Sequence, residues 1–137
     1  MKLKLLVLPL LIFIVSSCDL ENPGGVLTNN ELPASVIEFF ENTDILESEQ
    51  IIAYYDVTIA LDNSESAILT NKNLIYYKNG RIERFPLNSI ASIDAEDCFG
   101  LCIIVSTRDN RVMKIEIAPL NGGDLFLELL RKQVNKV

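Results

Sequence analysis

Between residues 51 and 118 the chain consists of short segments in which hydrophobic and polar residues alternate. The longest is 51–61, where every odd-numbered residue is apolar and Asp56 and Thr58 fall on the opposite face. Alternation with a period of two is typical of a β-strand with one buried face. Turn signals separate the segments, and Asn79-Gly80 is the strongest because it favours a two-residue hairpin. We expect strands at 51–61, 66–70, 74–78, 81–85, 89–95, 101–107 and 111–118.

An amphipathic helix is expected on each side of this strand region. The first helix is expected over 32–41. Pro33 suits its first turn, and Val36, Ile37 and Phe40 form one apolar stripe. The loop Asn121-Gly122-Gly123-Asp124 leads into a second helix with one apolar face. That face comprises Leu125, Phe126, Leu129, Leu130 and Val134. Seven antiparallel strands would close, or nearly close, into a barrel, and the second helix would cover one open end.

Three segments carry a resemblance to a known fold family. They read LESEQI at 46–51, AILTNKNLIYY at 67–77 and FPLNSIASI at 85–93. With the terminal helix, they resemble the bacterial pleckstrin-homology-like domains, close to the GRAM-type superfold. The resemblance implies a mainly β (α+β) fold, a PH-like seven-stranded antiparallel barrel or sandwich capped by a C-terminal amphipathic helix, with a short N-terminal helix. Asn73 stands where the family usually has Arg. These motifs describe architecture, so they imply fold more than function.

The first 18 residues have the layout of a secretory signal. Two lysines precede an apolar run over 5–15, which is shorter than the roughly 20 residues that span a bilayer. Val15-Ser16-Ser17-Cys18 comes next and resembles the lipobox of bacterial lipoproteins, whose cysteine thiol receives a diacylglycerol. The resemblance implies a signal peptide at 1–17, lipid attachment at Cys18 and a place in the bacterial cell envelope, on either membrane. The alternatives are an uncleaved anchor and an ordinary secretory signal.

The chain after the signal begins with a polar segment and carries a strongly negative net charge. Residues 18–31 contain Pro23-Gly24-Gly25, so we expect the lipidated cysteine and a flexible tether there, then one domain over 32–137. Removing the signal removes two of the twelve basic residues and none of the nineteen acidic ones, which leaves a net charge of −9. So acidic a surface repels nucleic acid and anionic lipid headgroups. The basic residues Lys72, Lys78, Arg81 and Arg84 are expected to pair with neighbouring carboxylates.

Cys98 and Cys102 flank a tight turn and have two interpretations. An oxidising compartment favours a disulfide between them. Alternatively they are two small, partly buried hydrophobic residues, and both interpretations stay open at this point. Two thiols do not supply the four soft ligands of a metal site. The nearby Asp94, Glu96 and Asp97 offer oxygens of the kind calcium binds, but their spacing favours a solvated strand end.

No catalytic constellation is visible in the sequence. The chain lacks histidine, the commonest general base and metal ligand. Its two glycine pairs lack the strand–loop–helix context of a phosphate-binding loop. We therefore predict that the protein is not an enzyme, with no catalytic residues, no metal and no cofactor.

The expected function is that of a lipid-anchored binding module in the cell envelope, which recruits a protein or a peptide. Its expected partners are the membrane, reached through the N-terminal lipid, and a protein. Two alternatives are a domain that binds a lipid or small amphiphile, and a structural component of the envelope.

Overall fold

The computed structural model describes residues 22–137, so Cys18 and the predicted signal peptide 1–17 lie outside the described residues. In chain order the elements are β1 (Val26–Thr28), η1 (Asn29–Glu31), α1 (Ala34–Thr43), β2 (Ile51–Asp56), β3 (Glu65–Thr70), β4 (Asn73–Lys78), β5 (Arg81–Pro86), η2 (Leu87–Ser89), β6 (Ile90–Asp97), β7 (Leu101–Thr107), β8 (Val112–Ile117) and α2 (Gly123–Val134). The elements η1 and η2 are single turns of 3-10 helix.

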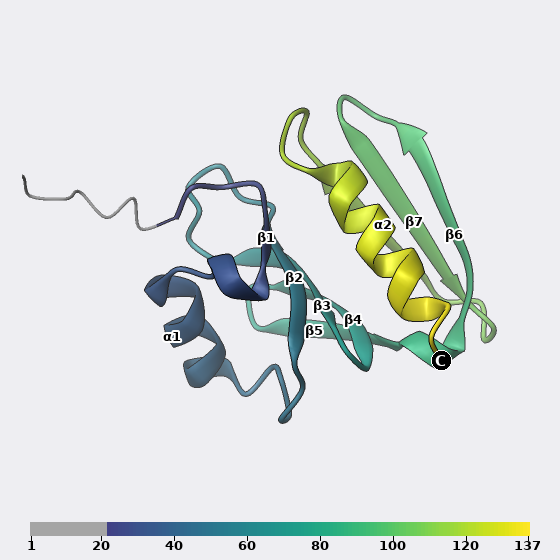
Figure 1. The fold of residues 1–137 in the computed structure, drawn as a ribbon, viewed down its shortest axis with the longest axis horizontal. Helices are drawn as coiled ribbons and strands as arrows, with labels where there is room; N and C mark the ends of the chain where they lie inside the picture. Colours follow the sequence, from purple (N-terminus) through teal and green to yellow (C-terminus); the bar gives the residue numbers. More distant parts are fainter. Residues whose placement is uncertain (1–21) are drawn as a thin grey trace, which may run out of the picture.

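The strands form two antiparallel sheets rather than one barrel. The first sheet has the order β1-β2-β3-β4-β5 and the second the order β6-β7-β8 (Figure 1). This confirms a mainly β fold with a C-terminal helix and a short N-terminal helix. The expectation that the strands close into a barrel is wrong. The chain turns at η2 between β5 and β6, and these two strands do not pair within the described residues. The space between the sheets is instead occupied by α2.

The larger hydrophobic cluster lies between the two sheets and α2. Phe85 of the first sheet, Ile103 of the second, and Phe126 of α2 are all completely buried in it. Leu125, which the sequence places on the apolar face of this helix, is 40% exposed. The buried face is centred on Phe126 and Leu130, and a neighbouring residue lies about 100° around an α-helix, at the rim of that face.

A second hydrophobic cluster lies on the opposite face of the first sheet, under α1. Phe40 of α1 meets the ring of Tyr54 edge-on, with centroids 5.6 Å apart. Phe39 meets Tyr77 in the same way at 5.0 Å. Figure 1 shows α1 and α2 on opposite sides of the five-stranded sheet. The central strands of this sheet are therefore buried on both faces, and α1 covers tyrosines that would otherwise face water.

Two sequence predictions about this sheet need correction. The segment 51–61 was expected to be one half-buried strand, but β2 ends at Asp56, is buried on both faces and has an irregular register between Ile51 and Ala53. The tether was expected to run to residue 31, but Val26–Thr28 forms β1, which pairs with Tyr55, Tyr54 and Ala53 of β2. Leu27 is buried in the cluster under α1, and this burial holds β1 in the fold.

We predict that Phe40→Ala lowers the free energy of unfolding by about 3 kcal/mol, because it removes a buried ring and leaves a cavity under α1. The matched control is Ile37→Ala on the same helix, where the side chain is 46% exposed and the loss should stay below about 1 kcal/mol. Urea denaturation measures both values. Equal losses in the two variants would contradict the packing of α1 on the sheet.

Candidate binding surface at one end of the domain

Three loops meet at one end of the domain, which we call the loop end. They are 57–64 between β2 and β3, 98–100 between β6 and β7, and 118–122 between β8 and α2. Ala118 lines three neighbouring hollows at this end. The loop around it is tied to the first sheet, since the Ala118 N–H donates to the Tyr55 hydroxyl at 3.1 Å.

Polar contacts within loop 57–64 determine its shape. The buried carboxylate of Asp56 accepts from the backbone N–H groups of Thr58 and Asn63, each at 2.8 Å. The Tyr54 hydroxyl donates to the Asn63 side-chain oxygen. At the tip, Asp62 accepts from the Ser64 hydroxyl and N–H, and these bonds lower the pKa of its carboxyl. The loop is therefore held by polar side chains of β2 and of the loop itself, although it belongs to neither sheet.

A disulfide closes the second loop. The structure joins Cys98 and Cys102 with their Cα atoms 5.7 Å apart, and Cys102 is completely buried. Gly100 has a φ of 126°, and a Cβ there would clash with the Ile117 carbonyl oxygen. The hairpin can approach β8 this closely only because residue 100 has no side chain. The side chain of Phe99, at the tip, is 95% exposed.

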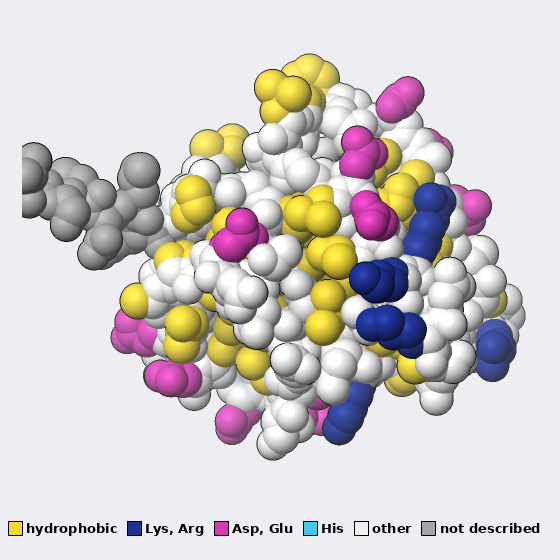
Figure 2. Space-filling model, viewed as in Figure 1, with side chains coloured by type: hydrophobic (Ala, Val, Ile, Leu, Met, Phe, Trp, Pro, Cys, Tyr) yellow, Lys and Arg dark blue, Asp and Glu magenta, His cyan; other side chains and the backbone are white. Residues whose placement is uncertain are grey.

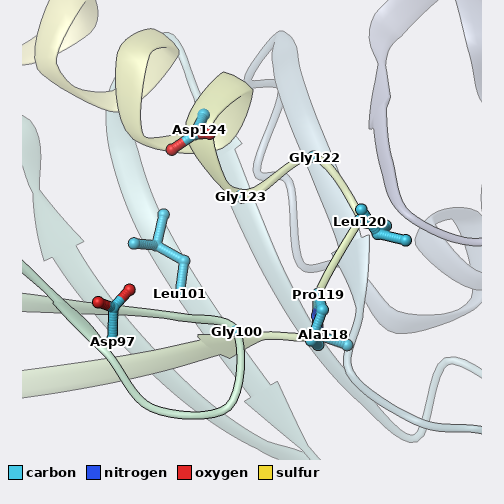
Figure 3. A pocket seen from close by; sticks show the side chains of 9 residues that line it. All are labelled: Asp97, Gly100, Leu101, Ala118, Pro119, Leu120, Gly122, Gly123 and Asp124. Carbon is cyan, nitrogen blue, oxygen red and sulfur yellow. The ribbon is translucent and has the colours of Figure 1, made fainter.

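One hollow at the loop end, of about 350 Å³, lies between this hairpin and the start of α2. In Figure 3 Asp97 and Asp124 lie on two sides of Leu101, while Leu120 points away from the hollow. Gly122 and Gly123 form its rim without side chains. The two carboxylates make the hollow acidic, and Asp124 occupies the positive end of the α2 dipole.

The acidic residues predicted beside the hairpin lie along β6. Asp94, Glu96 and Asp97 are all exposed, and among the described strands β6 pairs with β7 alone. Of the eight residues of β6, only Ile90 is buried. Within residues 22–137 no three acidic or cysteine side chains come together as they would to hold a metal ion. The structure thus places these carboxylates on an exposed edge strand.

The basic residues are divided between two kinds of environment. Lys78 forms an exposed ion pair with Glu65 at 3.1 Å. Arg84 is half-buried and forms an ion pair with Glu49 at 3.2 Å, while its other nitrogen donates to the Ile45 carbonyl at 2.7 Å. In Figure 2 Lys and Arg side chains gather over α2, and hydrophobic side chains lie at the edge over the loop that leads into it.

A network around Glu49 was not predicted from the sequence. Its carboxylate, with the side chain 3% exposed, accepts from Asn73 at 2.6 Å, from Arg84 and from the Thr70 hydroxyl. Glu49 and Thr70 come from two of the segments that resemble pleckstrin-homology-like domains, and they meet here across 21 positions. The network joins the chain before β2 to the β3–β4 turn, so its role is structural. The sequence feature that could have indicated this network is a carboxylate in one motif segment together with hydrogen-bonding polar residues in another.

No helix within residues 22–137 has the length and apolar character needed to cross a membrane. Comparison of the chain with protein-family models and with curated proteins found no match.

We predict a pH effect from Tyr54, which supports loop 57–64. Burial, and next the negative charge of Asp56, raise the pKa of the Tyr54 hydroxyl. Above the ordinary tyrosine pKa of about 10 the unfolded chain therefore loses this proton while the folded chain keeps it, so stability falls as pH rises. Tyr54→Phe should make that fall shallower by about 1.4 kcal/mol per pH unit.

Urea denaturation between neutral pH and the alkaline range tests this slope. Thr58→Ala is the control, because it removes a different hydrogen bond of this loop, the one from the Thr58 hydroxyl to Asp56, and leaves Tyr54 in place. It should lower stability and keep the wild-type slope. The same slope in Tyr54→Phe and in the wild type would show that Tyr54 is not the group responsible.

Proposed function

We propose that this protein is a non-enzymatic binding module of the bacterial cell envelope, anchored by lipid at Cys18. Two features of the sequence support the anchor: the signal layout over 1–17, and the lipobox-like Val15-Ser16-Ser17-Cys18. The described domain begins a few residues after that cysteine, with β1 at Val26. A folded domain on so short a tether has a role close to the membrane surface. The absence of histidine from the chain favours binding over catalysis.

We further propose that the domain is a variant of the pleckstrin-homology-like fold. Four strands, β2 to β5, face three strands, β6 to β8, and a C-terminal helix covers the gap. This division of strands supports the resemblance seen in the motif segments. The strand β1 and the helix α1 are additions at the N-terminus. They cover the outer face and one edge of the first sheet, which narrows the surfaces left for a partner.

The exposed edge of β6 is the observation that supports peptide recruitment. It spans Ile90–Asp97, and within residues 22–137 it pairs on one side only; from Asp94 to Asp97 it is exposed on both faces. Such an edge can take an additional strand, with backbone hydrogen bonds to the added chain. Asp94, Glu96 and Asp97 give this edge a negative charge. We therefore propose that the partner is a basic, extended segment of an envelope protein.

The anchor makes a prediction about the mature chain. Protein purified from the membranes of a bacterial host should lack residues 1–17 and carry added acyl mass on Cys18, because that thiol is the attachment atom. Intact-mass spectrometry measures both changes, and Cys18→Ala should show neither. An unacylated chain that still begins at Met1 would overturn the anchor.

Recruitment through β6 predicts a charge effect on partner capture. The double variant Asp94→Lys/Glu96→Lys should recover about tenfold less partner from native membranes, because repulsion at a contact costs more than about 1.4 kcal/mol. The matched control is Glu38→Lys/Glu41→Lys, which changes the net charge equally on the exposed side of α1. Quantitative mass spectrometry of cross-linked protein compares the two variants.

Undiminished capture by the β6 variant would overturn recruitment at this edge, and an equal loss in both variants would show a general charge effect instead. If the only protein recovered is a second copy of this chain, the structural-component alternative is favoured.

One observation supports the lipid or small-amphiphile alternative. A groove of about 290 Å³ runs beside α1, and its lining is mainly apolar, including Leu32, Ile37, Phe40 and Leu46. This groove accepts an apolar chain better than a charged group. Recovery of lipid without protein from the capture experiment would favour this function over peptide recruitment.

A further inference from the structure

The three most exposed large hydrophobic side chains of residues 22–137 lie one on each loop of the loop end. Ile59 is 103% exposed, Phe99 is 95% exposed and Leu120 is 104% exposed. The next in order are Val137 at 67% and Val112 at 59%. Each of the three therefore projects into solvent with almost no contact to the domain. None of the three is buried, so packing in the hydrophobic core does not account for a large apolar residue at these positions.

The backbone at two of these positions is also unusual. Phe99 has a φ of 60° and Leu120 a φ of 65°, in the left-handed region that glycine and asparagine occupy most easily. A bulky apolar residue at such a position is unfavourable for folding, and its exposure is unfavourable for solubility. Strained positions of this kind are often found where a protein contacts a ligand or partner.

The three side chains belong to one surface. Ile59 and Ala118 line one hollow, Phe99 and Ala118 line the next, and Leu120 and Ala118 line the third. Leu120 points outward from its hollow in Figure 3. Because all three hollows share Ala118, the exposed side chains surround a single point at the loop end.

The N-terminal chain enters the domain at this same point. A Cβ on Gly24 would lie 3.6 Å from the Leu61 side chain, and the Val26 N–H donates to the Asn121 carbonyl at 2.8 Å. Cys18 precedes Gly24 by six residues, which span at most about 20 Å when fully extended. A lipid on Cys18 would therefore keep the loop end near the bilayer surface.

We propose that the loop end docks on the bilayer, with Ile59, Phe99 and Leu120 inserted at the boundary between headgroups and acyl chains. This inference rests on the proposed lipid anchor at Cys18, which supplies the proximity. Asp97, Glu116 and Asp124 border the same hollows, so an anionic surface is repelled and a zwitterionic one is preferred. Docking orients the domain, because inserted apolar side chains fix which end faces the lipid.

The chain contains no tryptophan, so a single introduced tryptophan reports its own surroundings. The test uses full-length lipidated protein in vesicles of zwitterionic lipid brominated in the upper acyl chain, with Ile59→Trp, Phe99→Trp or Leu120→Trp. The matched control is Val112→Trp, which is exposed at the far end of β8, about 20 Å along the strand from Ala118. We expect a blue-shifted emission and loss of most of the fluorescence at the three loop positions, and neither change at 112.

The possible results separate docking from anchoring, because flotation with the vesicles and intact mass report the anchor independently. If the protein floats and is acylated but the loop tryptophans are not quenched, docking is overturned and the anchor stands. A blue shift without bromine quenching indicates contact with protein, and it also overturns docking. Equal quenching at 112, or quenching only after anionic lipid is added, contradicts the proposed orientation and lipid preference. A chain without acyl mass overturns the anchor and the inference together.

Discussion

Packing of Phe126 and Leu130 between the two sheets is the interaction on which the rest of the structure depends. Within residues 22–137 the sheets do not pair with each other through β5 and β6, and α2 packs with the inner faces of both in one hydrophobic cluster. Leu69 of the first sheet and Ile103 of the second are completely buried in the same cluster as these two side chains. The same packing positions loop 118–122 at the start of α2, and with it the centre of the loop end.

The second constraint is that the five-stranded sheet is covered on both faces. The helix α1 packs over Tyr54 and Tyr77, which removes them from the surface available to partners. Two surfaces of different chemistry remain prominent: the acidic, exposed edge of β6, and the apolar side chains of the loop end. They are connected, since β6 finishes at Asp97 beside the loop end. With the loop end on a bilayer, β6 would extend away from the membrane surface, where it is accessible to another envelope protein.

Local sequence patterns predicted most of the strands well. The expected strand at 101–107 coincides with β7, and the expected hairpin at Asn79-Gly80 joins β4 to β5. Alternation succeeded there because turn residues set the ends of each strand. It failed at 51–61, where loop residues after Asp56 continue the apolar alternation by coincidence while hydrogen bonds to the Asp56 carboxylate redirect the backbone. It also missed β1, because three residues are too few to show a period. These residues form a strand only because they pair with β2.

The candidate site was less accessible to sequence reasoning than the fold. Cys98, Cys102 and the neighbouring acidic residues attracted attention because their chemistry is visible in the sequence. Ile59, Phe99 and Leu120 did not, since a hydrophobic residue in a sequence gives no sign of whether it is buried. They become conspicuous only when their exposure and their positions are known together.

By itself the sequence determined the local elements, the acidic charge and the expectation of a lipid on Cys18, because these depend on neighbouring residues or on composition. Only the tertiary structure decided that the sheets stay separate, that α1 covers the outer face, and that three distant loops meet around Ala118. These features depend on contacts between residues far apart in the chain, such as the bond between Tyr55 and Ala118 across 63 positions. A local pattern carries no information about such contacts, because it does not specify which elements pack against one another.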